Sequence, residues 1–191
     1  MQSSRRSAPS KSKRLERDDW LEMSLDVLAK RGSAHLTITE VAHELGVTKG
    51  SFYHHFRDRA EFRREILGYW DKKYTRQITR DIPSDSGTPE DQLWQLLQAI
   101  SSNHAATYDV VIRAWAAREP DLARLVRRTD RYRRTFVQSL FEAMGFSGDE
   151  LEARTLSFML TMSSGRPELE AGSAAQQKQR LKALHSFFTR R

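Results

Sequence analysis

The residues from Lys49 to His55 gather side chains that can bind an anionic polymer. Within this short run the chain supplies an ammonium group, a serine hydroxyl, a phenol and two imidazoles, and no carboxylate follows until Asp58. Such groups donate hydrogen bonds to phosphate oxygens and to acceptor atoms on base edges. His54 and His55 are adjacent, so on a helix they diverge by about 100 degrees and make a poor metal-binding pair. The pattern favours nucleic-acid contact over metal chemistry.

The segment around these residues reads as two short helices joined by a tight turn. Thr37 and Glu40 have the spacing of a capping box, so we expect a helix to begin directly after Thr37. Gly46 is placed to end it in a left-handed conformation, and Thr48 is a second N-cap for a helix over residues 49–56. A short connection containing glycine lets two helices cross steeply, which presents the second one to a DNA major groove. The alternative is an ordinary helical hairpin with a polar face.

Apolar periodicity elsewhere predicts an all-α protein. A first helix is expected over about residues 13–30, and Asp58 can cap a long helix from Arg59 to about residue 80, which would span roughly 30 Å at ~1.5 Å per residue. Further helices are predicted after Thr88 and over about 109–117, 120–144, 147–161 and 174–190. We expect a disordered basic tail (1–14), an N-terminal three-helix helix-turn-helix domain (15–62) and, joined to it by the long helix, a C-terminal helical domain for ligand binding and dimerisation (63–191).

Composition and charge fit this division. The chain has 191 residues, 38% of them hydrophobic and 30% charged, and no cysteine, which removes disulfides, thiol nucleophiles and Cys-ligated zinc. Residues 1–80 hold 17 Lys or Arg against 11 Asp or Glu, whereas the rest holds 15 against 14. The basic excess lies with the helix-turn-helix, as expected of a nucleic-acid reader joined to a module with another task. The basic tail is either solvated or an arm that touches DNA.

The sequence also predicts where the protein acts and what it does not do. No apolar run reaches membrane-spanning length and no secretory signal is visible, so we expect a cytoplasmic protein without a membrane partner. We find no phosphate-binding loop, metalloprotease motif, serine nucleophile elbow or close acid pair, so we expect no enzyme, no catalytic residues, no metal site and no cofactor.

Residues from about Arg17 to Leu67 resemble the N-terminal domain of TetR-family transcriptional regulators. The likeness is carried by Leu36-Thr37-Ile38-Thr39-Glu40-Val41-Ala42, by Leu45-Gly46-Val47-Thr48-Lys49-Gly50-Ser51 and by Phe52-Tyr53-His54-His55-Phe56. It implies an all-helical homodimer that binds a palindromic double-stranded DNA operator, mostly as a repressor, and leaves it when an unknown small-molecule effector enters the C-terminal domain. A DNA-binding regulator or architectural protein without an effector remains the alternative, and a closed, fully packed C-terminal core would favour it.

Carried over by position, the resemblance assigns the DNA contacts. It places Thr39, Lys49, Gly50 and Ser51 at the entrance of the groove, Tyr53, His54 and His55 along the backbone, and Thr37 and Arg59 on phosphates, with Thr48 in the same set. The family usually has Lys where this chain has Arg59, which keeps the charge and changes the geometry of the contact. Tyr53 could instead be half-buried packing, and His55 a satisfied histidine under the first helix.

The C-terminal half offers candidates for a ligand cavity and for dimerisation. The cavity candidates are Trp94, His104, Tyr108, Trp115, Arg133, Phe136 and Phe158, with core packing as the alternative for the aromatic ones. Arg133 falls on an apolar stripe, so it either pairs with a carboxylate such as Asp130 or Glu119 or offers its charge to an acidic ligand. The last two helices carry more apolar surface than a small domain needs, which indicates a homodimer through Leu151, Thr155, Phe158, Met162, Leu181, Leu184 and Phe188; a simple monomer core is the alternative.

Overall fold

The computed structural model describes residues 15–82, 87–103, 105–163 and 171–190. In these residues the regular elements are all helices, joined by turns and short loops. In chain order the helices are α1 (Arg17–Arg31), the short η1 (Ser33–His35), α2 (Ile38–Glu44), α3 (Lys49–Phe52), α4 (Arg59–Asp71), η2 (Lys72–Arg76), α5 (Gln77–Arg80), α6 (Pro89–Ser102), α7 (Ala105–Ala116), α8 (Pro120–Ala143), α9 (Gly148–Ser163) and α11 (Ala174–Thr189). The predicted basic tail, with His104, lies outside the described residues. No described helix is both long and apolar enough to cross a membrane.

The predicted helix boundaries are confirmed where local capping sets them. Thr37 Oγ1 accepts a hydrogen bond from the Glu40 amide at 3.1 Å, and Asp58 Oδ1 accepts one from the Glu61 amide at 2.7 Å. These bonds satisfy amides that a helix start leaves without intrahelical partners. Gly46 follows α2 with φ of 68° in the left-handed region, which ends the helix as predicted.

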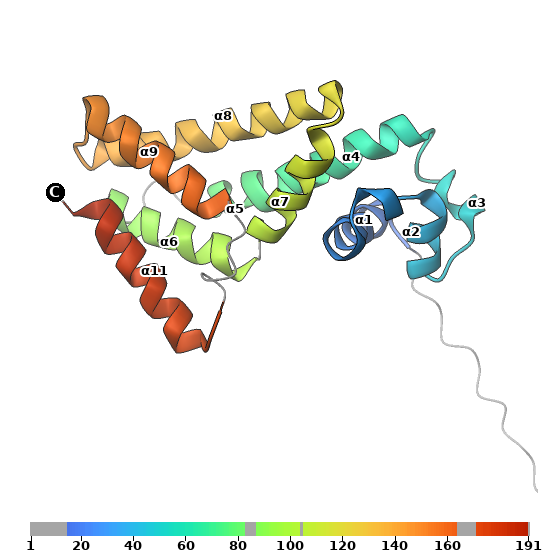
Figure 1. The fold of residues 1–191 in the computed structure, drawn as a ribbon, viewed down its shortest axis with the longest axis horizontal. Coiled ribbons are helices and arrows are strands. Elements are labelled where there is room, and N and C mark those ends of the chain that lie inside the picture. The colour runs from blue at the N-terminus through green and yellow to red at the C-terminus, as the bar shows by residue number, and fades with distance from the viewer. Residues whose placement is uncertain (1–14, 83–86, 104, 164–170, 191) are drawn as a thin grey trace, which may run out of the picture.

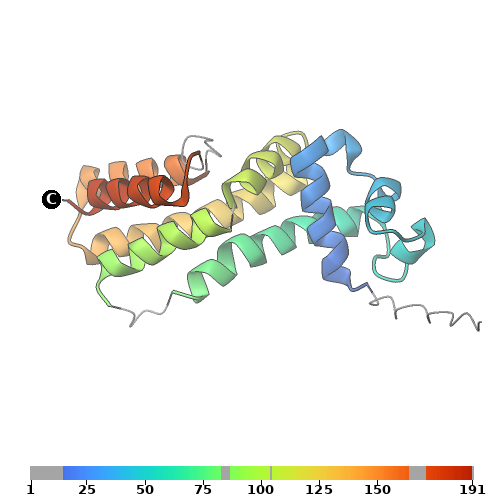
Figure 2. The same cartoon turned by 90° about the horizontal axis from the view of Figure 1, so that it is seen from below.

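The long helix predicted from Arg59 to about residue 80 is present, but it is interrupted. After α4 the chain makes a π-helical turn, η2, before α5 resumes the α-helix. Figure 2 shows this segment running along the molecule, with α1 lying across its N-terminal part. A π-helical turn inside an α-helix frequently marks a functional site. The predicted domain boundary at residue 62 also falls inside α4, so one helix belongs to both halves.

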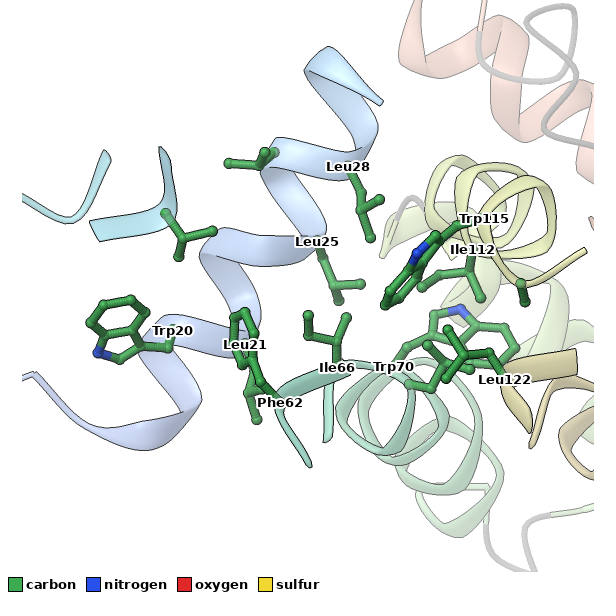
Figure 3. Packing of buried hydrophobic residues seen from close by; sticks show 14 of the residues in the cluster. Trp20, Leu21, Leu25, Leu28, Phe62, Ile66, Trp70, Ile112, Trp115 and Leu122 are labelled. Atoms are coloured by element: carbon green, nitrogen blue, oxygen red, sulfur yellow. The ribbon is translucent and has the colours of Figure 1, made fainter. Parts of the chain in front are cut away.

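A shared hydrophobic core joins the two halves. Trp20, Leu21 and Leu25 of α1 pack with Phe62, Ile66 and Trp70 of α4, and Ile112 and Trp115 of α7 close the cluster (Figure 3). Each of these eight side chains is at most 5% exposed. A polar bond reinforces the contact, because Tyr108 of α7 donates its hydroxyl to Asp26 of α1 at 2.8 Å. α7 is therefore packed directly against the first helix of the N-terminal domain.

The second core lies at the opposite end of the molecule, among α6, α8, α9 and α11 (Figure 1). Its packing corrects the predicted dimer contacts. Thr155, Phe158, Met162, Leu181 and Phe188 are buried within the single chain, and Phe158 packs on Phe188 with ring centroids 5.3 Å apart. Buried side chains cannot reach a second copy, so they form the monomer core. The other two predicted contacts, Leu151 and Leu184, are half-buried against this core.

Candidate nucleic-acid interface and ligand cavity

The predicted recognition residues lie on an exposed face at the N-terminal end of the molecule. Lys49 begins α3 and is exposed, as are Gly50, Tyr53 and His54, whereas Ser51 is half-buried. Tyr53 is 60% exposed, so packing does not explain this aromatic residue. The other predicted groove residues, Thr39 and Thr48, are exposed too, and the Thr48 hydroxyl makes no capping hydrogen bond. These side chains are available to an external partner.

Two phenylalanines hold this face in place from below. Phe52 and Phe56 are 0% and 1% exposed, stack with centroids 5.1 Å apart and both contact Phe62 of α4. The predicted helix over residues 49–56 is shorter than expected, since α3 ends at Phe52 and a tight turn follows. In this turn the amides of Tyr53, His54 and His55 bond to carbonyls three residues earlier. The histidines and the tyrosine are weak helix formers, and such tightening is common where a helix ends.

His55 differs from its neighbours. It is half-buried, and its ring centroid lies 6.3 Å from that of Trp20 in α1. This is the position of a histidine under the first helix, the alternative that the sequence left open. Contact between His55 and DNA stays a prediction that the structure favours less than contact through Lys49 or His54.

The two predicted phosphate-binding residues lie together although they are far apart in sequence. Thr37 and Arg59 line one hollow of about 180 Å³, with Arg63 on the same wall. Arg59 is exposed and has no ion-pair partner among the described residues, whereas Arg63 pairs with Glu119 and lies over the Trp115 ring. A hydroxyl donor beside an unpaired guanidinium is a suitable place for a phosphate oxygen.

Acidic residues near this face are neutralised by the protein itself. Arg31 pairs with Glu40 and Glu44 of α2. The pKa of Asp58 is lowered by the hydrogen bond from the Glu61 amide and then by Arg57, and the pKa of Glu61 is lowered by the Arg57 amide and then by Arg17. These carboxylates stay ionised while being satisfied internally, which weakens their repulsion of a DNA backbone.

Gly50 supplies a prediction that separates folding from binding. A Cβ at this position would meet only Thr48 Oγ1, at an ordinary 3.6 Å, so the chain itself does not require glycine there. Gly50→Ala is expected to raise the free energy of unfolding by up to about 1 kcal/mol. The same methyl group would obstruct close approach of a DNA backbone, so affinity for DNA should fall. Urea denaturation and a DNA titration of the same preparation test both effects, and unchanged DNA affinity would remove Gly50 from the interface.

A cavity of about 40 Å³, the candidate ligand site, lies in the C-terminal half against η2. Of the predicted cavity residues, Arg133, Phe136 and Phe158 line it. Tyr108 instead bonds to Asp26, Trp115 is part of the shared core, and Trp94 lies beside His185 in a separate hollow between α6 and α11.

Arg133 makes an ion pair, but its partner differs from the predicted ones. It bonds to Asp109 of α7, while Asp130 pairs with Arg113 at 2.7 Å and Glu119 pairs with Arg63. Asp109 is 2% exposed, and its other oxygen accepts the Trp70 indole N–H of α4 at 2.9 Å. One carboxylate thus joins the cavity wall to the helix that enters the N-terminal domain.

Asp109 was not among the residues predicted from the sequence. A signal was present, because Ala105, Asp109, Ile112 and Ala116 follow helical spacing and are all buried. A lone carboxylate on such a face indicates a buried ion pair. Which cation it meets cannot be read from the spacing.

Comparison with known proteins agrees with this arrangement. Residues 21–66 match the family of bacterial regulatory proteins named tetR. Over 94 residues, 47% of this chain, the sequence is 33% identical to the HTH-type transcriptional repressor KstR2 of Mycobacterium tuberculosis. That match spans 46% of the repressor, so the chain spans about half the length of the curated relative.

Solved structures share the fold along most of the chain. A transcriptional regulator from Rhodococcus sp. Rha1 has a TM-score of 0.71 at 19% identity, covering 92% of this chain and 94% of that one. The structure of AibR in complex with isovaleryl coenzyme A and operator DNA has a TM-score of 0.72 at 14% identity, covering 91% and 99%. The fold and the residues from Thr37 to Phe56 together define an all-helical protein with an N-terminal helix-turn-helix. Residues 21–66 are thus similar to the tetR family of bacterial regulatory proteins, and most of the chain shares the fold of solved structures described as TetR-family regulators.

Proposed function

We propose that the protein binds a palindromic DNA operator as a homodimer and represses transcription until a small-molecule effector releases it. The observation that carries the proposal is the exposed face of α3. Lys49 at the start of α3 and Tyr53 and His54 of the turn after it point outward, while Phe52 and Phe56 fix this segment to the core and neighbouring acids are paired internally. A rigid, cationic helix start is suited to reading base edges in a major groove. A relative that is a repressor and a neighbour solved with operator DNA support this proposal.

The dimer contact is placed on the outer face of α9, beside α8. Leu156 and Leu160 are 47% and 63% exposed there. The same face has exposed Arg127 and Arg131 of α8 near the leucines, and in the first half of α9 it has exposed Asp149 and also Glu152, which pairs with Arg134 of the same chain. A two-fold axis that sets these helices antiparallel across the interface would bring each basic end to the partner's acidic end, around an apolar centre.

Leu160→Glu tests this contact. It is expected to convert the dimer to monomer, because a carboxylate would be buried at the apolar centre of the interface. Val110→Glu is the matched control, since Val110 is also an exposed apolar residue but lies on α7. Sedimentation velocity reads the outcome. A dimer that persists in Leu160→Glu would move the interface elsewhere.

The proposed effector acts where the cavity meets the long helix. Tyr74 and Thr75 of η2 line the cavity, and Arg133 bonds to the Thr75 hydroxyl at 2.7 Å and to the Tyr74 carbonyl at 3.3 Å. A ligand that spreads these walls would shift η2 and, through Trp70, α4. In a dimer such a shift changes the spacing of the two recognition segments, which is about one DNA turn, ~34 Å, in the binding state.

Selection of duplexes from a random pool tests the proposal as a whole. The expected product is an inverted repeat with half-sites one helical turn apart, bound better than a scrambled duplex at physiological salt. Binding no better than to scrambled DNA would end the proposal.

A regulator without an effector is the second candidate. The observation that favours it is the size of the cavity, because sites for drug-sized ligands have volumes of about 300–1,000 Å³ and this cavity has about 40 Å³. Release of the selected operator by a ligand that occupies the cavity would exclude this candidate.

A further inference from the structure

The cavity is lined mainly by apolar side chains, together with the Arg133–Asp109 pair and the hydroxyl-bearing residues Tyr74, Thr75, Thr79 and Ser163. Its walls include Ile78, Leu96, Phe136, Phe158 and Met162. Among the described residues of the lining the one cation is Arg133, and each of its three guanidinium nitrogens donates to a protein acceptor, namely Thr75 Oγ1, the Asp109 carboxylate and the Tyr74 carbonyl. Its charged group also lies 4.9 Å from the centroid of the Trp70 ring.

Counted over the residues that the structure describes, the charges around the Arg133–Asp109 pair balance without a ligand. Arg133 is paired with Asp109, and the side chains of these two residues are 14% and 3% exposed. Arg113 is paired with Asp130 and lies 3.9 Å from Asp109. Two cations therefore face two anions. If a ligand carboxylate displaced Asp109 from Arg133, Asp109 could turn to Arg113, but the cluster would still hold one anion too many.

From this balance we infer that the cavity takes an uncharged, largely apolar ligand and excludes acids. Burying an extra carboxylate without a counter-charge is costly, whereas a hydroxyl or carbonyl group needs only a hydrogen bond. The inference rests on the proposed ligand-responsive regulator and names the class of its effector.

The size of the cavity adds a second restriction. At about 40 Å³ it has room for a slender group, and a longer one must displace side chains. Met159 and Met162 line it, and unbranched methionine side chains adapt readily to a new neighbour. An n-alkyl chain with one polar end is a suitable probe of both size and charge.

Octan-1-ol and octanoate make a matched pair, because they share the chain and differ in charge at neutral pH. We expect octan-1-ol to raise the Tm of the wild-type protein and to bind about tenfold more tightly than octanoate in calorimetry, or better. Met162→Trp fills the cavity and should abolish the effect of octan-1-ol. Any of three results would overturn the inference. Octanoate could bind as tightly as octan-1-ol, neither compound could bind up to its solubility limit, or octan-1-ol could bind to Met162→Trp as tightly as to the wild-type protein.

Two further variants test the charge argument directly. Asp109→Asn leaves Arg133 without its counter-ion, so this variant should gain affinity for octanoate. The double variant Asp109→Asn/Arg133→Met removes both charges and should bind octan-1-ol but not octanoate. If Asp109→Asn fails to fold, the double variant decides, because octanoate binding to it would show that charge does not control selection. These measurements contain no DNA, so they test ligand selection separately from operator binding. The inference about the ligand can fail while operator binding is confirmed, and operator binding can fail while the inference about the ligand holds.

Discussion

Lys49→Ala is expected to remove about 1–3 kcal/mol of discrimination between the selected operator and a scrambled duplex in each half-site, the range for a good base contact. Lys49 is the first residue of α3, is exposed and has no ion-pair partner among the described residues. Its ammonium group can reach the O6 and N7 acceptors of guanine, which other base pairs do not present together. Because the side chain packs against nothing in the core, folding should be unaffected. Titrations of both duplexes at one salt concentration measure the effect.

Arg59→Ala is the matched comparison. Arg59 lies beside Thr37 in a hollow suited to a phosphate, so its removal should weaken binding to both duplexes alike. The slope of log K against log salt should become shallower by about 0.9 for each phosphate that the variant no longer neutralises. Thermal unfolding of each variant serves as the folding control. If Lys49→Ala weakened binding to both duplexes equally, Lys49 would not be the base contact. If Arg59→Ala weakened binding to the operator alone, Arg59 would not be a phosphate contact.

Features set by neighbouring residues could be predicted from the sequence. The caps at Thr37 and Asp58 and the left-handed Gly46 are local, because each is fixed within four residues. Phe52 and Phe56 lie four positions apart, the spacing of one helix face, which agrees with their burial although α3 is shorter than the predicted helix. The exposed face of α3 followed in turn, so most of the proposed DNA interface was visible before the fold was known.

Features set by distant residues could not be predicted in the same way. Asp109 and Arg133 are 24 positions apart, and only the packing of α7 against α8 shows that they meet. The five predicted dimer residues that the single chain buries were misassigned for a related reason, whereas Leu151 and Leu184 stay predictions. α9 has two apolar faces, and periodicity does not say which of them the chain buries, so Phe158 was assigned to the dimer contact as well as to the cavity, and exposed Leu160 was assigned to neither. The π-helical turn η2 has no sequence signal that we recognise.

Asp109→Ala is expected to lower the free energy of unfolding by about 3–5 kcal/mol, the range for removing one partner of a buried ion pair. The substitution leaves the Arg133 guanidinium buried without its counter-ion and the Trp70 indole N–H without its acceptor. The decrease should be measured by urea denaturation in the absence of DNA. A decrease below about 1 kcal/mol would show that water replaces the carboxylate and that solvent reaches the ion pair.

Two companion variants divide this decrease between the partners of Asp109. Trp70→Phe keeps an aromatic ring but removes the indole N–H and reduces the size of the ring. Loss of the hydrogen bond should lower the free energy of unfolding by about 1 kcal/mol, in addition to the effect of the smaller ring. Asp109→Leu/Arg133→Met replaces the whole pair by apolar groups and should recover most of the stability that Asp109→Ala removes. The double variant also lacks the carboxylate that joins the cavity wall to α4. In this variant, a ligand in the cavity should therefore no longer change the affinity for the operator. The carboxylate would then serve to connect ligand and DNA rather than to stabilise the fold, because an apolar replacement folds equally well without it.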